Sequence, residues 1–146
     1  SLSMEIAKDG EGATKLLTCN VTGAPTKNCA RAVAKSVITS SLLKCAIFGQ
    51  DANWGRILCA IGYTQVAKED DFVIDHINVD MGSDYGKITV CTNGKGVEFS
   101  EEEAAKILAL DEVYIDVDMG LGDEKATAWG CDLTYDYVKI NGDYRT

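Results

Sequence analysis

The chain has 146 residues, of which 46% are hydrophobic and 25% charged, with a single proline, and this composition fits one globular domain. Its formal net charge of -9 opposes binding to nucleic acid and to anionic lipid, because both need a surplus of lysine and arginine. No apolar run approaches the ~20 residues of a membrane helix, and the first residues lack the basic and apolar regions of a signal peptide. We therefore expect a cytoplasmic protein with no nucleic-acid or membrane partner.

The first half of the chain predicts the end of a helix, one strand and two further helices. Residues 2–8 are typical of the end of a helix, and residues 16–21 have β-like composition. After the capping residue Thr26, apolar residues recur at helical spacing over residues 27–39, and they do so again over residues 54–62. Between the two helices lies a short apolar stretch, residues 42–48.

The second half predicts mainly strands. Residues 72–79 alternate along the chain and residues 88–91 are β-branched, so these should be paired strands. Ser100 and Glu103 form a capping box that predicts a helix through Leu108. Further extended segments are expected at residues 113–117, 126–133 and 135–140. Because βαβ alternation is not regular, we predict an α+β fold with mixed sheet layers packed by about three to four helices.

The cysteines favour burial over a disulfide framework, since they are widely spaced and each lies among Val, Ile, Leu or Ala. No CxxC pair or Cys/His cluster occurs, and the only histidine is His76, so we expect no metal site. The six cysteines are Cys19, Cys29, Cys45, Cys59, Cys91 and Cys131.

Two short segments have similar sequences, residues 77–82 and residues 115–120, each a strand followed by an acidic turn. The similarity is too short to establish a duplication. In the second, Asp116, Asp118 and Asp123 superficially resemble a calcium loop, but the spacing and the terminal glutamate of an EF-hand are missing. A solvated turn is the favoured interpretation.

Two segments have the composition of a polar binding site. Residues 9–15 place two carboxylates, an ammonium group and a hydroxyl around two glycines, which suits a zwitterion but is also typical of a polar turn. Residues 51–56 suit polar recognition at a helix start. The alternative there is that Asp51 or Asn53 caps the helix, Trp54 is buried and Arg56 pairs locally.

The C-terminal segment contains three tyrosines, which indicates that residues 135–146 are docked rather than free. If they are docked at a cleft, Asn141 and Thr146 offer an amide, a hydroxyl and a terminal carboxylate to a ligand. Otherwise they form a last strand and a short tail. No Gly-x-Ser-x-Gly sequence occurs, and His76 has no recognisable nucleophile beside it.

Taken together, the sequences DGEGATK (9–15), FGQDANWGRI (48–57) and ATAWGCDLTYDYVKINGDYRT (126–146) resemble the ornithine acetyltransferase (glutamate N-acetyltransferase) family. The resemblance covers nearly the whole chain. It implies that residues 1–146 are a single C-terminal region of the family's β chain.

The resemblance also implies an activity. Family members cut themselves before a threonine, which then carries acetyl from N-acetylornithine to glutamate. They need no cofactor, although some members accept acetyl-CoA as acetyl donor. Carried across, the family's substrate-binding residues fall on Glu11, Asn141 and Thr146.

The chain departs from the family pattern in what it lacks. The family's cleavage motif is absent, because Ala126-Thr127 is followed by Ala128-Trp129, and the α chain is absent too. The resemblance therefore implies that the catalytic threonine lies outside this chain, that the chain alone is inactive, and that its partners are the α chain and the remainder of the β chain in a heterotetramer. The alternative is a noncatalytic acidic α+β module that binds a ligand or another protein.

Overall fold

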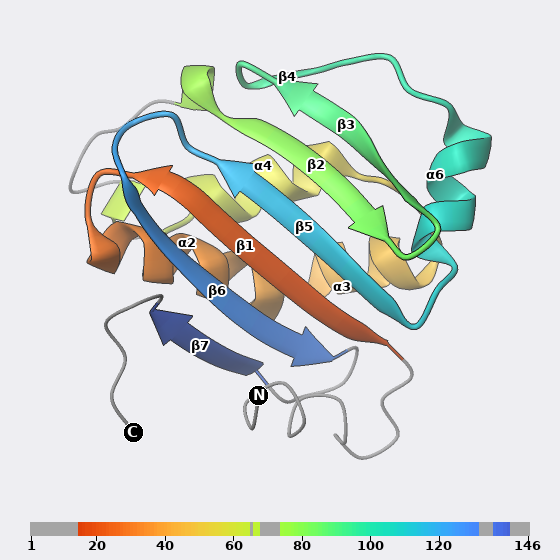
Figure 1. The fold of residues 1–146 in the computed structure, drawn as a ribbon, viewed down its shortest axis with the longest axis horizontal. Coiled ribbons are helices and arrows are strands. Elements are labelled where there is room, and N and C mark those ends of the chain that lie inside the picture. Colours follow the sequence, from red (N-terminus) through yellow and green to blue (C-terminus); the bar gives the residue numbers. More distant parts are fainter. Residues whose placement is uncertain (1–14, 65, 68–73, 132–135, 141–146) are drawn as a thin grey trace.

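The computed structural model describes residues 15–64, 66–67, 74–131 and 136–140. In these residues the strands form one mixed sheet, in which β1 and β5 are parallel and all other neighbours are antiparallel (Figure 1). The order across the sheet is β4-β3-β2-β5-β1-β6-β7. The strands are β1 (Leu16–Ala24), β2 (Asn78–Ser83), β3 (Gly86–Thr92), β4 (Lys95–Gly96), β5 (Glu112–Asp118), β6 (Glu124–Cys131) and β7 (Asp136–Ile140).

Helices lie behind this sheet in Figure 1, with one more beside its β2 and β3 strands. Those behind it are α2 (Lys27–Thr39), α3 (Ser41–Phe48) and α4 (Trp54–Gly62), and the one beside it is α6 (Glu101–Leu108). No helix in the described part of the chain is long and apolar enough to cross a membrane.

Side-chain caps define where the helices begin. The Thr26 hydroxyl accepts a hydrogen bond from the Cys29 amide at 3.0 Å, and the Ser100 hydroxyl accepts one from the Glu103 amide at 3.1 Å. Each cap satisfies an amide that the helix itself leaves unpaired. The acidic first turn of α6 also suits the positive end of the helix dipole.

The core lies between the sheet and the helices. Along β1, Leu17, Cys19 and Val21 are at most 2% exposed, whereas Thr18 and Asn20 between them are half-buried. The same alternation gives β5 three fully or almost fully buried residues, Val113, Ile115 and Val117. Successive side chains of a strand point to opposite faces, so one face of the sheet is apolar and the other is polar.

The predicted α+β class, with a mixed sheet and helices, is confirmed, although the described strands form one sheet rather than several layers. The predicted helices 27–39 and 54–62 match α2 and α4, and the apolar stretch 42–48 is helical as part of α3. The proposed helix end at residues 2–8 lies outside the described residues.

Residues 72 and 73 of the strand predicted over residues 72–79 lie outside the described residues, and the prediction is wrong for residues 74–76. Residues Ile74–His76 form a 3-10 turn, closed by the Ile77 amide donating to the Ile74 carbonyl at 2.9 Å, and β2 begins only at Asn78. The turn lies against a residue distant in the sequence, since a Cβ on Gly94 would fall 2.5 Å from the Ile74 oxygen. Alternation along the chain does not reveal such a contact.

Candidate functional site

The three residues assigned to substrate binding by resemblance, Glu11, Asn141 and Thr146, lie outside the described residues, and their role stays a prediction. Lys15, from the same segment as Glu11, is described. Its ammonium donates to the carbonyls of Leu108 at 2.9 Å and Leu110 at 2.8 Å, at the C-terminal end of α6. A cation is favourable at that end of a helix. Lys15 therefore anchors the start of β1 to α6 and is engaged by backbone rather than left free for a ligand.

Glu11 precedes strand β1, and Asn141 and Thr146 follow strand β7. The start of β1 and the end of β7 lie at different positions along the strand direction of the sheet. β1 begins at Leu16, which is opposite Cys131 on β6. β7 runs parallel to β1 on the other side of β6 and ends at Ile140, opposite Ala126, which itself faces Val21. The start of β1 and the end of β7 are thus offset by about 17 Å along the strands, the length of five extended residues.

In the segment 51–56, the capping interpretation is confirmed. The Asn53 Oδ1 accepts a hydrogen bond from the Arg56 amide at 3.1 Å, and its Nδ2 donates to Asp51 Oδ2 at 3.1 Å. Trp54 packs against the core, and Arg56 Nη1 donates to the carbonyl of Leu42 at 2.6 Å. The guanidinium of Arg56 is therefore held locally.

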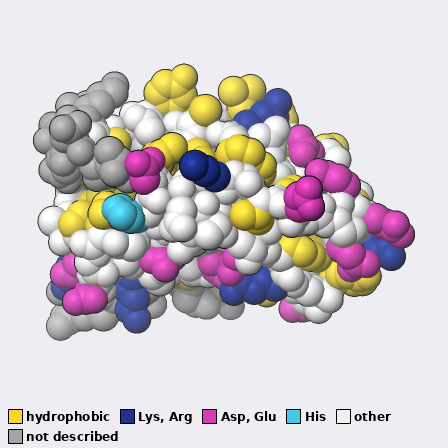
Figure 2. All heavy atoms as spheres, turned by 90° about the horizontal axis from the view of Figure 1, so that it is seen from above, with side chains coloured by type: hydrophobic (Ala, Val, Ile, Leu, Met, Phe, Trp, Pro, Cys, Tyr) yellow, Lys and Arg dark blue, Asp and Glu magenta, His cyan; other side chains and the backbone are white. Residues whose placement is uncertain are grey.

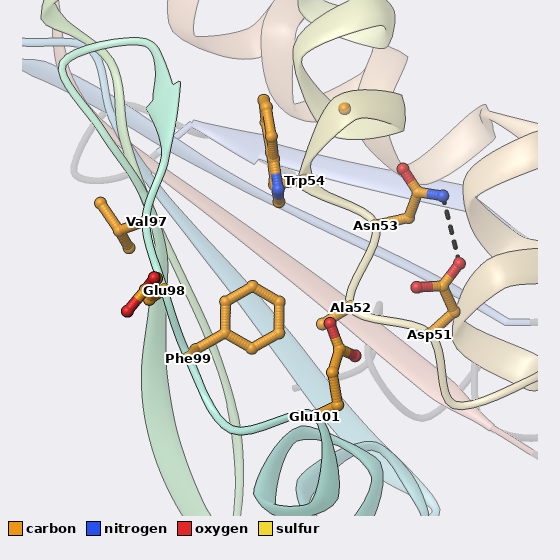
Figure 3. Close-up of a pocket in the computed structure, with 9 residues that line it drawn as sticks. Asp51, Ala52, Asn53, Trp54, Val97, Glu98, Phe99 and Glu101 are labelled. Atoms are coloured by element: carbon orange, nitrogen blue, oxygen red, sulfur yellow. Dashed lines mark hydrogen bonds between the residues drawn. The ribbon is translucent and has the colours of Figure 1, made fainter.

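The same segment also forms one wall of a pocket with a volume of about 600 Å³. Figure 3 shows residues 51–55 on one side and residues 97–101 on the other, with Phe99 and Glu101 facing Ala52 across the hollow. Ala52 is 3% exposed and closes the inner side. No sequence pattern pointed to residues 97–101, because they meet residues 51–55 only through tertiary packing.

A second polar region lies on the face of the sheet turned away from helices α2, α3 and α4, which no described helix covers and which we call the open face. Asn20 Nδ2 donates to Asp116 Oδ1 at 2.9 Å, and the Thr127 hydroxyl donates to Asn20 Oδ1 at 2.9 Å. Lys87 bridges Asp116 at 3.1 Å and Asp80 at 3.5 Å. A groove of about 420 Å³ runs beside this network. It is lined by Asn20, Thr22, Asn78, Asp80, Asp116, Val117 and Asp118.

Lys87 neutralises a repulsion between two carboxylates that the strand register places opposite each other. β2 and β5 carry the two similar segments noted in the sequence, and they pair with each other so that Asp80 is directly opposite Asp116. Two like charges in that position destabilise a sheet. Lys87 lies between them, and the hydrogen bond and charge of Asp116, followed by Asp80, raise the pKa of its ammonium group.

The acidic segment at the end of β5 forms a turn closed by its own side chain. Asp118 Oδ1 accepts a hydrogen bond from the Gly120 amide at 3.0 Å, and Gly120 has a positive φ of 66°. Asp116 is engaged instead by Asn20 and Lys87. In the described part of the chain, no group of three His, Cys, Asp or Glu residues is placed to hold a metal ion.

The cysteines divide into two groups. Cys19, Cys29, Cys91 and Cys131 are buried as expected, and burial raises the pKa of the Cys19 and Cys91 thiols, which keeps them protonated; the charge of nearby Asp116 adds to the effect at Cys19. The expectation is wrong for Cys45 and Cys59, which are exposed. Apolar neighbours in the sequence therefore did not indicate burial at these two positions.

A family model described as "ArgJ family" matches residues 1–146. The chain belongs to the ArgJ family. The match confirms the resemblance that the three sequence segments indicated. Among curated relatives, the arginine biosynthesis bifunctional protein ArgJ of Caldanaerobacter subterraneus subsp. tengcongensis is 52% identical over the whole of this chain and 35% of its own length. ArgJ 1 of Clostridium acetobutylicum is 53% identical over 99% of this chain and 35% of its own length.

A solved structure agrees with these relatives. The crystal structure of arginine biosynthesis bifunctional protein ArgJ from Bacillus halodurans superposes with a TM-score of 0.79 at 44% sequence identity, over 92% of this chain and 60% of that one. The chain thus spans about a third of the length of the curated ArgJ relatives it matches. The C-terminal position of this third, which the resemblance implied, stays a prediction.

Proposed function

We propose that the chain is part of an acetyltransferase of arginine biosynthesis that moves acetyl from N-acetylornithine to glutamate through a threonine acyl-enzyme. The observation that carries this proposal is the family match over residues 1–146, together with 44% identity to a solved ArgJ structure at a TM-score of 0.79. In this proposal the chain acts in the cytoplasm with the α chain and the remainder of the β chain, and it supplies substrate-binding groups.

The nucleophile of this reaction belongs to the part of the enzyme outside this chain. Two threonines of the recognised family segments follow an alanine, Thr14 and Thr127. Thr14 lies outside the described residues, whereas Thr127 supports this view by its surroundings. It lies inside β6, it is 8% exposed, and its hydroxyl donates to Asn20 Oδ1 at 2.9 Å. A hydroxyl held in this way inside a strand has no free α-amine beside it to act as base.

Substrate binding is assigned to Glu11, Asn141 and Thr146. The carboxylate of Glu11 attracts the substrate ammonium group, while the amide of Asn141 and the hydroxyl of Thr146 hold the amino-acid end and orient the acyl carbon for attack. These groups must therefore converge at one pocket wall.

The positions at which β1 begins and β7 ends define what this convergence requires of the chain. Ile140 leaves β7 at the level of Val21, about 17 Å along the strands from Leu16 and two strand spacings, about 10 Å, to the side. Glu11 lies five positions before Leu16 in the sequence, and an extended segment of that length spans about 17 Å. Convergence with Asn141 therefore requires the segment before Leu16 to return along the sheet toward the Val21 level.

The experiment compares the chain alone with the chain reunited with the rest of its parent protein. Transfer of labelled acetyl from N-acetylornithine to glutamate is expected only in the second sample. In that sample Glu11→Gln should raise KM for N-acetylornithine by about tenfold, because a charge-assisted bond is lost. Glu5→Gln, which removes a carboxylate from the same part of the chain, is the matched control and should leave KM unchanged. Transfer by the chain alone would contradict the proposal.

A noncatalytic binding module remains the second candidate, and the net charge of -9 and the acidic groove beside β2 and β5 are the features that favour it. The coding sequence upstream of Ser1 separates the two. An alanine-threonine cleavage site and an α region there support the enzyme. A start codon directly before Ser1 supports the module.

A further inference from the structure

We propose that the pocket between residues 51–55 and residues 97–101 binds an aliphatic primary ammonium group. The proposal stands on the pocket's own chemistry and its test measures binding, so it does not depend on acetyl transfer. It rests on three properties of the pocket: its shape, its charge and its aromatic side chains.

The apolar side chains that line the pocket are held in place by packing. Trp54 and Phe99 both pack against the hydrophobic core, and Ala52 is nearly fully buried. The indole of Trp54 lies directly over the backbone of β4, since a Cβ on Gly96 would fall 2.3 Å from the ring. The side chains that form the wall are thus held by packing, and a ligand does not have to order them first.

The charge of the lining is negative only. Asp51, Glu98 and Glu101 contribute carboxylates, and no Lys, Arg or His is among the described residues that line the hollow. In Figure 3 the carboxylate of Glu101 faces the hollow between Phe99 and Ala52. Figure 2 shows acidic side chains gathering toward the end of the molecule where α6 lies. A cation is therefore favoured in the pocket over an anion.

The start of α4 does not reverse that preference. A free helix start attracts anions through its unpaired amides. Here Asn53 Oδ1 already accepts from the Arg56 amide, and the Arg56 side chain donates to the Leu42 carbonyl. Two of the groups that could hold an anion at this wall, the amide and the guanidinium of Arg56, are therefore engaged elsewhere.

The aromatic side chains determine what kind of cation fits. The faces of Phe99 and Trp54 attract an organic ammonium ion through their ring electrons and also accommodate an aliphatic chain. A small metal ion needs several oxygen ligands converging on one point. In Figure 3 the carboxylates of Asp51 and Glu98 lie at the two outer sides of the hollow, apart from that of Glu101. The arrangement suits an ammonium on an alkyl chain.

The test uses Trp54 as its reporter. The chain has two tryptophans, so Trp129→Phe leaves Trp54 as the only one. In this background, n-butylammonium chloride should change the Trp54 emission with saturation in the millimolar range, whereas sodium butyrate and sodium chloride at equal ionic strength should not. Equal responses to all three salts would overturn the proposal, because they would show only general ionic effects on an acidic protein.

Two variants test the assigned groups. Glu101→Gln should weaken binding of n-butylammonium by about fivefold, and Phe99→Leu by about threefold. The matched control is Glu102→Gln: its carboxylate is in the same acidic first turn of α6 and has the same dipole effect, but it does not line the pocket. Equal weakening by Glu101→Gln and Glu102→Gln, or unchanged binding in both Glu101→Gln and Phe99→Leu, would overturn the proposal.

Discussion

The two faces of the sheet are built from the same strands but are stabilised in different ways. The face toward the helices is held by burial: Cys19, Ile115 and Val117 are at most 1% exposed. The open face is held by lateral bonds among polar side chains, such as that from Asn20 to Asp116. Burial can thus be inferred strand by strand, whereas the polar network exists only once five strands, β1, β2, β3, β5 and β6, are in register.

The largest expected difference comes from the helix-covered face. Ile115→Ala should lower the free energy of unfolding by about 3 kcal/mol, because it removes fully buried methyl groups from the central strand β5 and leaves a cavity. Urea unfolding followed by circular dichroism measures this. Lys125→Ala, at an exposed position of β6, is the control and should change stability by less than about 0.5 kcal/mol. Similar losses in both variants would show that the core is not where the structure places it.

An intermediate effect is expected from the centre of the open face. Asn20→Ala should cost about 1–2 kcal/mol, because it leaves both the Thr127 hydroxyl and the Asp116 carboxylate without a bond that each now has. A double-mutant cycle with Thr127→Val checks the network directly. Additive losses in this cycle would mean that the two side chains are not coupled.

The smallest effect is expected from Lys87. Lys87→Met leaves Asp80 opposite Asp116 without a cation, but the Lys87 side chain is 51% exposed, so solvent screening limits the loss to about 0.5 kcal/mol. The loss should shrink further in 1 M salt and be partly recovered by Asp80→Asn. An undiminished loss in high salt would indicate packing rather than charge.

The same pair predicts the pH dependence. The folded protein raises the pKa of Lys87 above its ordinary value of 10.5, first through the hydrogen bond to Asp116, so folding favours the protonated amine. The contribution is therefore complete below about pH 10.5 and is lost as the pH rises through the folded pKa. The stability difference between the wild type and Lys87→Met should be constant from pH 8 to about 10 and should decrease above that range.

Local patterns in the sequence were sufficient for most of the elements. Helical spacing located α2 and α4, and Ser100 with Glu103 located the start of α6, because periodicity and caps involve neighbouring residues. Alternation failed at Ile74–His76, where the chain forms a turn that lies against Gly94. It could not show that Cys45 and Cys59 are exposed, since each neighbours apolar residues that face the other way.

For the candidate sites too, some features were indicated by the sequence and others required the tertiary structure. The sequence alone indicated the family, a cap at Asp51 or Asn53 and the α+β class, because each depends on residues that are adjacent in the chain or on the order of elements. Tertiary structure decided which distant segments meet: residues 51–55 with 97–101 around the pocket, and Asp80 with Asp116 beside Lys87. The physical reason is that the register of strands and the packing of helices bring together groups whose separation along the chain carries no periodic signal.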